Sequence, residues 1–178
     1  MNYVIIIAQI LSILGMAGVI LSMQCRSNKN FFIVQGTAGL LFAVSFGMLN
    51  AWAGALMNIF SLVRAWVLNN PKIAKSKVTL ILLILALILC TGSLLYYFKE
   101  KWYLVLIVFI AQMISNFAMW SQNGKIIRHT QLIFISPLWL TYNFIIPIPS
   151  IGGILTETLT MISVAVALIR YRKIGFTK

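Results

Sequence analysis

The chain has 178 residues, of which 61% are hydrophobic and 9% charged, and its 14 basic and two acidic residues give a net charge of +12. A soluble chain of this length could not bury so much apolar surface in one core. The basic residues lie between apolar segments and not in a continuous basic surface, which argues against a nucleic-acid partner. The composition therefore predicts a membrane protein that crosses the bilayer several times.

The apolar segments set the expected helices. Crossing a hydrocarbon core of about 30 Å takes about 20 helical residues. Seven segments come close to this length, and the third and sixth meet the criterion least well. They are residues 3–23, 31–49, 53–69, 78–98, 103–121, 131–147 and 152–170. We predict an all-α polytopic membrane protein with seven transmembrane helices.

The basic residues predict the orientation of these helices. With seven spans, Lys99 and Lys101 fall on one side of the membrane, beside Glu100, and twelve basic residues fall on the other. Basic loop residues stay in the cytoplasm, so the N-terminus should lie outside and the C-terminus in the cytoplasm. The twelve are Arg26, Lys29, Arg64, Lys72, Lys75, Lys77, Lys125, Arg128, Arg170, Arg172, Lys173 and Lys178.

The chain contains a weak internal repeat. A shift of 99 positions superimposes the first three segments on the last three and aligns Asn58 with Glu157 and Ser61 with Thr160. One extra helix between two three-helix units gives both units the same orientation, which predicts parallel repeats in a 3+1+3 arrangement. The expected divisions are a first repeat over residues 1–77, a linker helix over 78–102 and a second repeat over 103–178.

The 3+1+3 plan resembles the SWEET and PQ-loop transporter superfamily. The segments NAWAGALMNIF (Asn50 to Phe60) and GGILTETLTM (Gly152 to Met161) resemble the bacterial YgjV inner-membrane family. The resemblance covers nearly the whole chain and implies a multi-pass protein of the bacterial inner (plasma) membrane with a SWEET-like fold.

The chain also departs from the superfamily pattern. It contains no Pro-Gln dipeptide, and only Pro137, in the sixth segment, matches the helix prolines of SWEETs. Glycines in the first two segments are the candidate bending points in place of the missing prolines, namely Gly15, Gly18, Gly36 and Gly39.

Two stripes of small and polar residues mark the candidate site. Steps of four, three and four place the members of each stripe on one helix face. The stripes are Gly54, Asn58, Ser61 and Ala65 on the third segment, and Gly153, Glu157, Thr160 and Val164 on the seventh. Asn58 and Glu157 resemble the asparagine pair with which SWEETs contact sugar hydroxyls. The alternative is that both stripes serve only helix packing.

Glu157 calls for a functional explanation because a carboxylate in mid-membrane costs roughly 2 to 4 kcal/mol. If unpaired, it is a candidate for proton coupling as the cavity opens to alternate sides. Its candidate partner is Arg64, which lies about 9 Å beyond Asn58 along the third helix. We expect the Arg64 side chain to extend to the cytoplasmic rim, the alternative being that it points back toward Glu157.

Further amides and hydroxyls extend the candidate cavity lining. Such groups suit a neutral, sugar-like or zwitterionic solute better than an anion. The expected pore-facing residues are Gln9, Ser12, Gln35, Gln112, Asn116, Tyr142 and Asn143. Trp139 is deep enough to stack on a sugar ring. The candidate substrate-binding set is Asn58, Ser61, Asn116, Trp139, Tyr142, Asn143, Glu157 and Thr160.

The sequence offers no catalytic or metal-binding constellation. It has one His, no Asp and two widely separated Glu residues. Intramembrane enzymes need paired acids, a nucleophile beside a base or clustered ligands. We expect no enzyme activity, no metal and no cofactor, and we expect His129 to be a solvated residue of a basic cytoplasmic loop.

The resulting prediction is a transporter or facilitator that moves a small polar solute by alternating access. The expected partners are the solute and the lipid bilayer, and the chain would work as a monomer or a homo-oligomer. The alternative is a non-transporting accessory or scaffold protein, and a channel is a weaker third reading. A transporter predicts a cavity at the level of Glu157, whereas a scaffold predicts Glu157 packed against Asn58 with no cavity.

Overall fold

The computed structural model describes residues 3–70, 72–99, 101–172 and 175–176, and within them it contains helices and no strand. The helices follow one another through short connections. They are α1 (Tyr3–Gln24), α2 (Asn28–Met48), α3 (Trp52–Asn69), α4 (Lys77–Tyr96), α5 (Trp102–Trp120), α6 (Gly124–Thr130), the π-helical turn η1 (Gln131–Ile135), α7 (Ser136–Ile145) and α8 (Ile151–Arg170). The all-helical prediction is confirmed.

The largest difference from the predicted helix boundaries is at α6. Residues 122–130 were expected to form a loop, but α6, η1 and α7 form one continuous helical run over residues 124–145. The run starts early because the Asn123 side chain caps it, its Oδ1 accepting hydrogen bonds from the N–H groups of Lys125 and Ile126 at 3.0 and 3.4 Å. His129 is exposed as predicted but lies in this helix, with Nδ1 2.8 Å from the Lys125 carbonyl.

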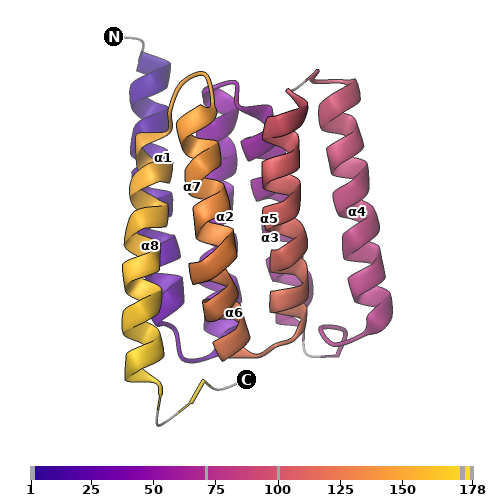
Figure 1. Cartoon of the computed structure of the whole chain (residues 1–178), viewed down its shortest axis with the longest axis vertical. Coiled ribbons are helices and arrows are strands. Elements are labelled where there is room, and N and C mark those ends of the chain that lie inside the picture. The colour runs from indigo at the N-terminus through magenta and orange to yellow at the C-terminus, as the bar shows by residue number, and fades with distance from the viewer. Residues whose placement is uncertain (1–2, 71, 100, 173–174, 177–178) are drawn as a thin grey trace.

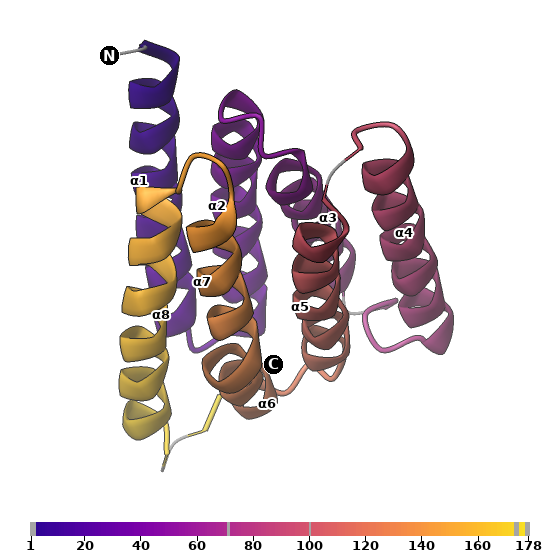
Figure 2. The same ribbon diagram turned by 45° about the horizontal axis from the view of Figure 1, so that its top comes forward.

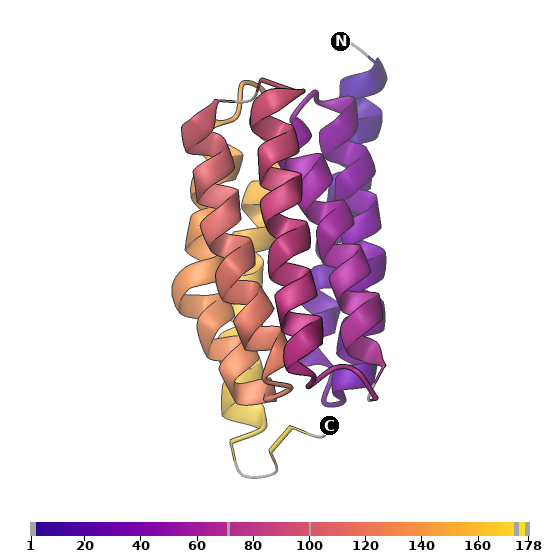
Figure 3. The same ribbon diagram turned by 90° about the vertical axis from the view of Figure 1, so that its right-hand side faces the viewer.

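Five helices in the described part of the chain are long and apolar enough to cross a membrane: α1, α2, α4, α5 and α8. The two predicted spans that do not reach this standard are α3 and the run over residues 124–145, which are the two that met the sequence criterion least well. Polar residues such as Asn58 and Arg64 interrupt the apolar sequence of α3, although the helix itself is continuous. The π-helical turn divides the run over residues 124–145. Both nevertheless lie alongside the other helices in the bundle (Figures 1 and 3).

The helices form a ring with one helix outside it. Around the ring, α1 packs against α2, α2 against α3, α3 against α5, α5 against α7, α7 against α8, and α8 against α1. Helix α4 packs against α3 and α5 and stands at the edge of the bundle (Figures 1 and 2). The space enclosed by the ring contains the candidate site.

The two ends of the bundle differ in charge. Lys99 and Lys101 lie at the end where the chain starts, and Arg26, Lys29 and Lys125 lie at the end where it finishes (Figure 1). Glu100, Lys173 and Lys178, which contributed to the sequence argument, fall outside the described residues.

Two arginines of the predicted cytoplasmic set are buried instead. Arg64 is 3% exposed and Arg128 is 1% exposed. The expectation that Arg64 extends to the cytoplasmic rim is wrong, because hydrogen-bond acceptors on α5 lie within reach of its guanidinium.

The glycines of α1 and α2 lie at close helix contacts. A Cβ added to Gly15 would lie 2.9 Å from the Phe42 ring, and one added to Gly18 would lie 2.9 Å from the Ala38 Cβ. Both α1 and α2 are uninterrupted helices, so these glycines permit close packing. The irregular turn lies just before Pro137, whose ring nitrogen has no hydrogen to donate to the preceding turn.

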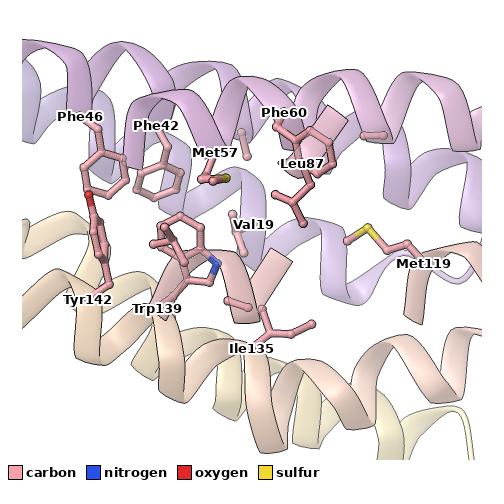
Figure 4. Packing of buried hydrophobic residues seen from close by; sticks show 14 of the residues in the cluster. Val19, Phe42, Phe46, Met57, Phe60, Leu87, Met119, Ile135, Trp139 and Tyr142 are labelled. Carbon is pink, nitrogen blue, oxygen red and sulfur yellow. The ribbon is translucent and has the colours of Figure 1, made fainter. Parts of the chain in front are cut away.

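An aromatic cluster joins α2 to α7 toward the end of the bundle where α1 starts (Figure 1). Figure 4 shows Phe42 and Phe46 from α2 facing Trp139 and Tyr142 from α7. The Phe46 ring lies 6.4 Å from that of Trp139 and 6.0 Å from that of Tyr142. The Tyr142 hydroxyl accepts a hydrogen bond of 2.7 Å from the N–H of Gly54, which has no helical partner in the first turn of α3.

Candidate functional site

The ring of helices encloses a cavity of about 60 Å³. A few water molecules fill such a volume, whereas sites for small-molecule ligands usually have about 300 Å³ or more. The polar residues that line it are Gln35, Asn58, Ser61, Arg64, Gln112, Ser115, Gln131, Asn143, Thr156 and Glu157. The apolar lining includes Phe42, Phe46, Met119, Ile135 and Trp139. The cavity therefore has both polar and apolar walls around a water-sized space.

Arg64 reaches the cavity from α3 and is held by neutral groups. Its Nη1 donates hydrogen bonds to Gln112 Oε1 at 2.7 Å and to Asn116 Oδ1 at 3.1 Å, and its Nη2 donates to Ser61 Oγ at 3.3 Å. Its Nε is buried without a hydrogen-bond partner. Removing a charged group from water costs several kcal/mol unless an opposite charge and full hydrogen bonding offset it. Arg64 is thus a buried cation whose contacts in the structure are all uncharged.

Glu157 faces the same cavity from α8. The Ser136 hydroxyl on α7 donates a hydrogen bond to its carboxyl group, and Gln131 Nε2 donates in turn to Ser136 Oγ at 3.0 Å. The second carboxyl oxygen, Oε2, is buried without a hydrogen-bond partner. Among the described residues, no ion pair within 4 Å joins Glu157 to Arg64. The two ionisable groups therefore border one cavity without contacting each other.

Asn58 and Glu157 line the cavity together, as the two stripes predict. Asn58 Nδ2 donates to the Gly54 carbonyl at 2.9 Å within its own helix. No hydrogen bond joins the Asn58 and Glu157 side chains in the described part of the chain.

Five of the eight predicted substrate-binding residues line the cavity: Asn58, Ser61, Trp139, Asn143 and Glu157. The other three are buried behind its wall. Asn116 accepts a hydrogen bond from Arg64, Tyr142 accepts one from Gly54, and Thr160 is 0% exposed with no hydrogen-bond partner for its Oγ1.

Of the other four residues expected to face the pore, two line the cavity and two do not. Gln35 and Gln112 line the cavity. Ser12 instead lies where α1 meets α8, against Gly152, and donates a hydrogen bond of 2.8 Å to the Gln9 carbonyl. Gln9 has a buried Oε1 without a hydrogen-bond partner.

Sequence reasoning did not place Gln131, Ser136 and Thr156 at the site. Ser136 aligns with Thr37 at the repeat offset, so the alignment contained a signal for it. Gln131 gave no such signal, because it lies in the π-helical turn before Pro137, where side-chain directions differ from those of a regular α-helix. Thr156 lies on α8 next to Leu155 and Glu157 and does not belong to the predicted stripe. The described residues contain no group of three or more His, Cys, Asp or Glu side chains that could hold a metal ion.

Comparison with known proteins identifies the family of the chain. No match was found among curated proteins or among solved structures. The Imp-YgjV family, described as bacterial inner membrane protein, matches residues 6–174. This match spans nearly the whole chain, including the cavity and every described helix except the first residues of α1. The chain therefore belongs to the Imp-YgjV family of bacterial inner membrane proteins.

Proposed function

We propose that this protein transports a small polar solute across the bacterial inner membrane by alternating access, through the cavity that Asn58 and Glu157 border. The observation that carries the proposal is that one carboxyl and one guanidinium group line a single cavity within the bundle, with no ion pair between them among the described residues. Ionisable groups inside a membrane protein usually mark a substrate or ion pathway.

The alternative of a scaffold protein fits this site less well. A structural carboxyl group would be expected to pack against its partner and to have its hydrogen bonds satisfied. Glu157 instead has one unpartnered oxygen and borders a cavity, and it makes no hydrogen bond to the Asn58 side chain among the described residues. A channel would need a continuous polar path, whereas aromatic side chains form part of the cavity lining, namely those of Phe42, Phe46 and Trp139, which pack near one another (Figure 4).

The size of the cavity supports a closed conformation. At about 60 Å³ it is smaller than typical ligand sites, so a solute enters only if helices move apart. An opening of the cavity toward the outside would separate the aromatic rings of Phe46, Trp139 and Tyr142 and break the hydrogen bond from Gly54 to Tyr142. Movement about the turn before Pro137 would supply the hinge.

The packing order supports the proposed 3+1+3 arrangement with seven crossings. In both proposed units the helices pack in chain order, as α1, α2 and α3 in the first and as α5, α7 and α8 in the second. The contact of α3 with α5 then corresponds to that of α8 with α1, as a twofold axis along the membrane normal requires. Helix α4 lies outside the ring, as a linker would.

Proton coupling through Glu157 is part of the proposal. A carboxyl group that faces a cavity opening to alternate sides takes up a proton on one side and releases it on the other. Its unpartnered Oε2 leaves an oxygen free for that proton. This step needs no metal or cofactor.

The test is transport in proteoliposomes that contain a pH-sensitive dye. Pools of monosaccharides, amino acids and nucleosides are added to liposomes with the wild-type protein, with Glu157→Gln or with Glu100→Gln, the same change at the other acidic residue. We expect one pool to drive proton movement across the liposome membrane, Glu157→Gln to reduce that flux by at least about tenfold, and Glu100→Gln to leave it unchanged.

Two other outcomes of this transport experiment would support a different function. Solute uptake without proton movement would retain the transporter and remove proton coupling. A folded wild-type protein that moves no solute from any pool would overturn the transport proposal in favour of an accessory role.

A further inference from the structure

The cavity presents donors on one wall and acceptors on another. Arg64 on α3 supplies the donor wall: its guanidinium is buried, its contacts are neutral, and its Nε has no partner. A guanidinium has five N–H donors in a planar fork that matches a carboxylate. An anionic group of a bound solute would give Arg64 the counter-charge that the protein does not provide.

The Arg64 side chain is held in place before any solute arrives. Gln112 Nε2 donates to Ser61 Oγ at 2.8 Å and to the Met57 carbonyl at 3.1 Å, which aims its carbonyl oxygen at Arg64. The same Ser61 oxygen accepts from Arg64 Nη2. A fixed guanidinium loses little further freedom when it binds an anion, which favours binding.

The acceptor wall lies on α7 and α8. Glu157 Oε2 and Asn143 Oδ1 both belong to cavity-lining residues, and both atoms are buried without hydrogen-bond partners. The orientation of the Asn143 amide follows from its Nδ2, which donates to the Trp139 carbonyl at 2.9 Å and so leaves the oxygen as the free atom. Two unpartnered acceptors beside one cavity suit an ammonium group, which has three donors and no acceptor.

We propose that the solute is a small zwitterion of the amino-acid type, whose carboxylate binds Arg64 and whose ammonium binds Glu157 and Asn143. This inference rests on the proposed transport function and narrows its substrate class. A neutral sugar would leave both ionisable groups without a counter-charge, and a simple anion or a simple amine would supply only one of the two. A zwitterion pairs both groups and keeps the cavity neutral overall.

The first test compares solutes that differ by one charged group. Purified wild-type protein is mixed with the twenty amino acids as a pool, the matching carboxylic acids without the amine, the matching amines without the carboxylate, or a monosaccharide pool. Thermal unfolding reports binding, and uptake into proteoliposomes reports transport. We expect the amino-acid pool alone to raise the unfolding temperature and to be taken up.

Three variants test the assigned contacts. Arg64→Gln should weaken amino-acid binding by about tenfold or more, because a charge-assisted hydrogen bond is lost. Arg64→Lys should retain part of the affinity, since it keeps the charge. Arg170→Gln, the same change at an exposed arginine at the end of α8, should leave affinity unchanged.

The outcomes separate this inference from the transport proposal. Uptake of monosaccharides, or of amines or acids as efficiently as amino acids, would overturn the zwitterion inference and leave transport intact. Amino-acid binding without uptake would keep the binding site and overturn transport. No binding and no uptake would overturn both, and the wild-type comparison decides even if the Arg64 variants do not fold.

Discussion

Two arginines are buried in this protein, and their surroundings give them different roles. Arg128 Nε and Nη2 donate to the Met23 carbonyl at 3.2 and 3.1 Å, Nη2 also donates to the Cys25 carbonyl at 2.7 Å, and Nη1 donates to the Gly124 carbonyl at 3.1 Å. Its guanidinium also lies 4.0 Å from the centre of the Phe176 ring. Arg128 therefore caps carbonyls at the C-terminal end of α1, whereas Arg64 faces a cavity.

Replacing Arg128 should destabilise the protein. Arg128→Met would leave several buried carbonyl groups without donors, at roughly 1 to 3 kcal/mol each. We expect the free energy of unfolding to fall by about 3 kcal/mol, as measured by denaturant titration of the protein in detergent. Arg170→Met, at an exposed position, should change it by less than about 0.5 kcal/mol. An Arg128→Met protein as stable as the wild type would contradict the capping role.

At the scale of elements, small residues determine how closely the helices approach. A Cβ added to Gly152 on α8 would overlap the Ser12 side chain and lie 2.9 Å from the Ser12 backbone carbon on α1. Backbone atoms cannot turn aside as a flexible side chain does. In contrast, Gly92 on α4 has nothing within 4 Å of an added Cβ.

The two glycines give opposite predictions for the same substitution. Gly152→Ala should push α1 and α8 apart and lower stability by about 1 to 3 kcal/mol, which corresponds to a melting temperature lower by several degrees. Gly92→Ala should raise stability by roughly 0.5 to 1 kcal/mol, because alanine is the better helix former. Thermal unfolding of both variants in one detergent checks the pair. Equal melting temperatures would show that the α1–α8 contact is not tight.

At the scale of the whole molecule, the charge difference between the two ends predicts how the protein sits in the membrane. Lys101 lies at one end and Lys125 at the other, and both are exposed. Since basic loops are retained in the cytoplasm, we expect Lys125 inside and Lys101 outside. The proposed seven crossings put the start of α1 and the end of α8 on opposite sides of the membrane, and these two points lie at opposite ends of the bundle (Figure 1).

Thiol labelling of intact cells tests the orientation. After Cys25 and Cys90, which are free, are replaced by alanine, single cysteines are introduced as Lys101→Cys or Lys125→Cys. A membrane-impermeant maleimide should label Lys101→Cys in intact cells and Lys125→Cys only after permeabilisation. The reverse pattern would invert the topology, and labelling of both in intact cells would show that α5, which lies between them, does not cross the membrane.

The amino-acid sequence alone determined the helices and the two stripes. Apolar segment length and helical periodicity are local properties, so five of the seven predicted spans correspond to long apolar helices, and Asn58, Ser61 and Glu157 reach one cavity. The start of α6 at Gly124 was missed because a capping side chain set it, even though Asn123 was visible in the sequence.

Only the tertiary structure decided which polar groups contact one another. Arg64 is buried because Gln112 and Asn116 on α5 present acceptors to it, and the helix periodicity of α3 contains no information about that neighbour. Tyr142 and Asn116 do not line the cavity for the same reason: each contacts a residue of another helix, Gly54 and Arg64 respectively. Helix periodicity fixes the face of a side chain, whereas its depth, its partners and the cavity volume depend on the packing of all the helices together.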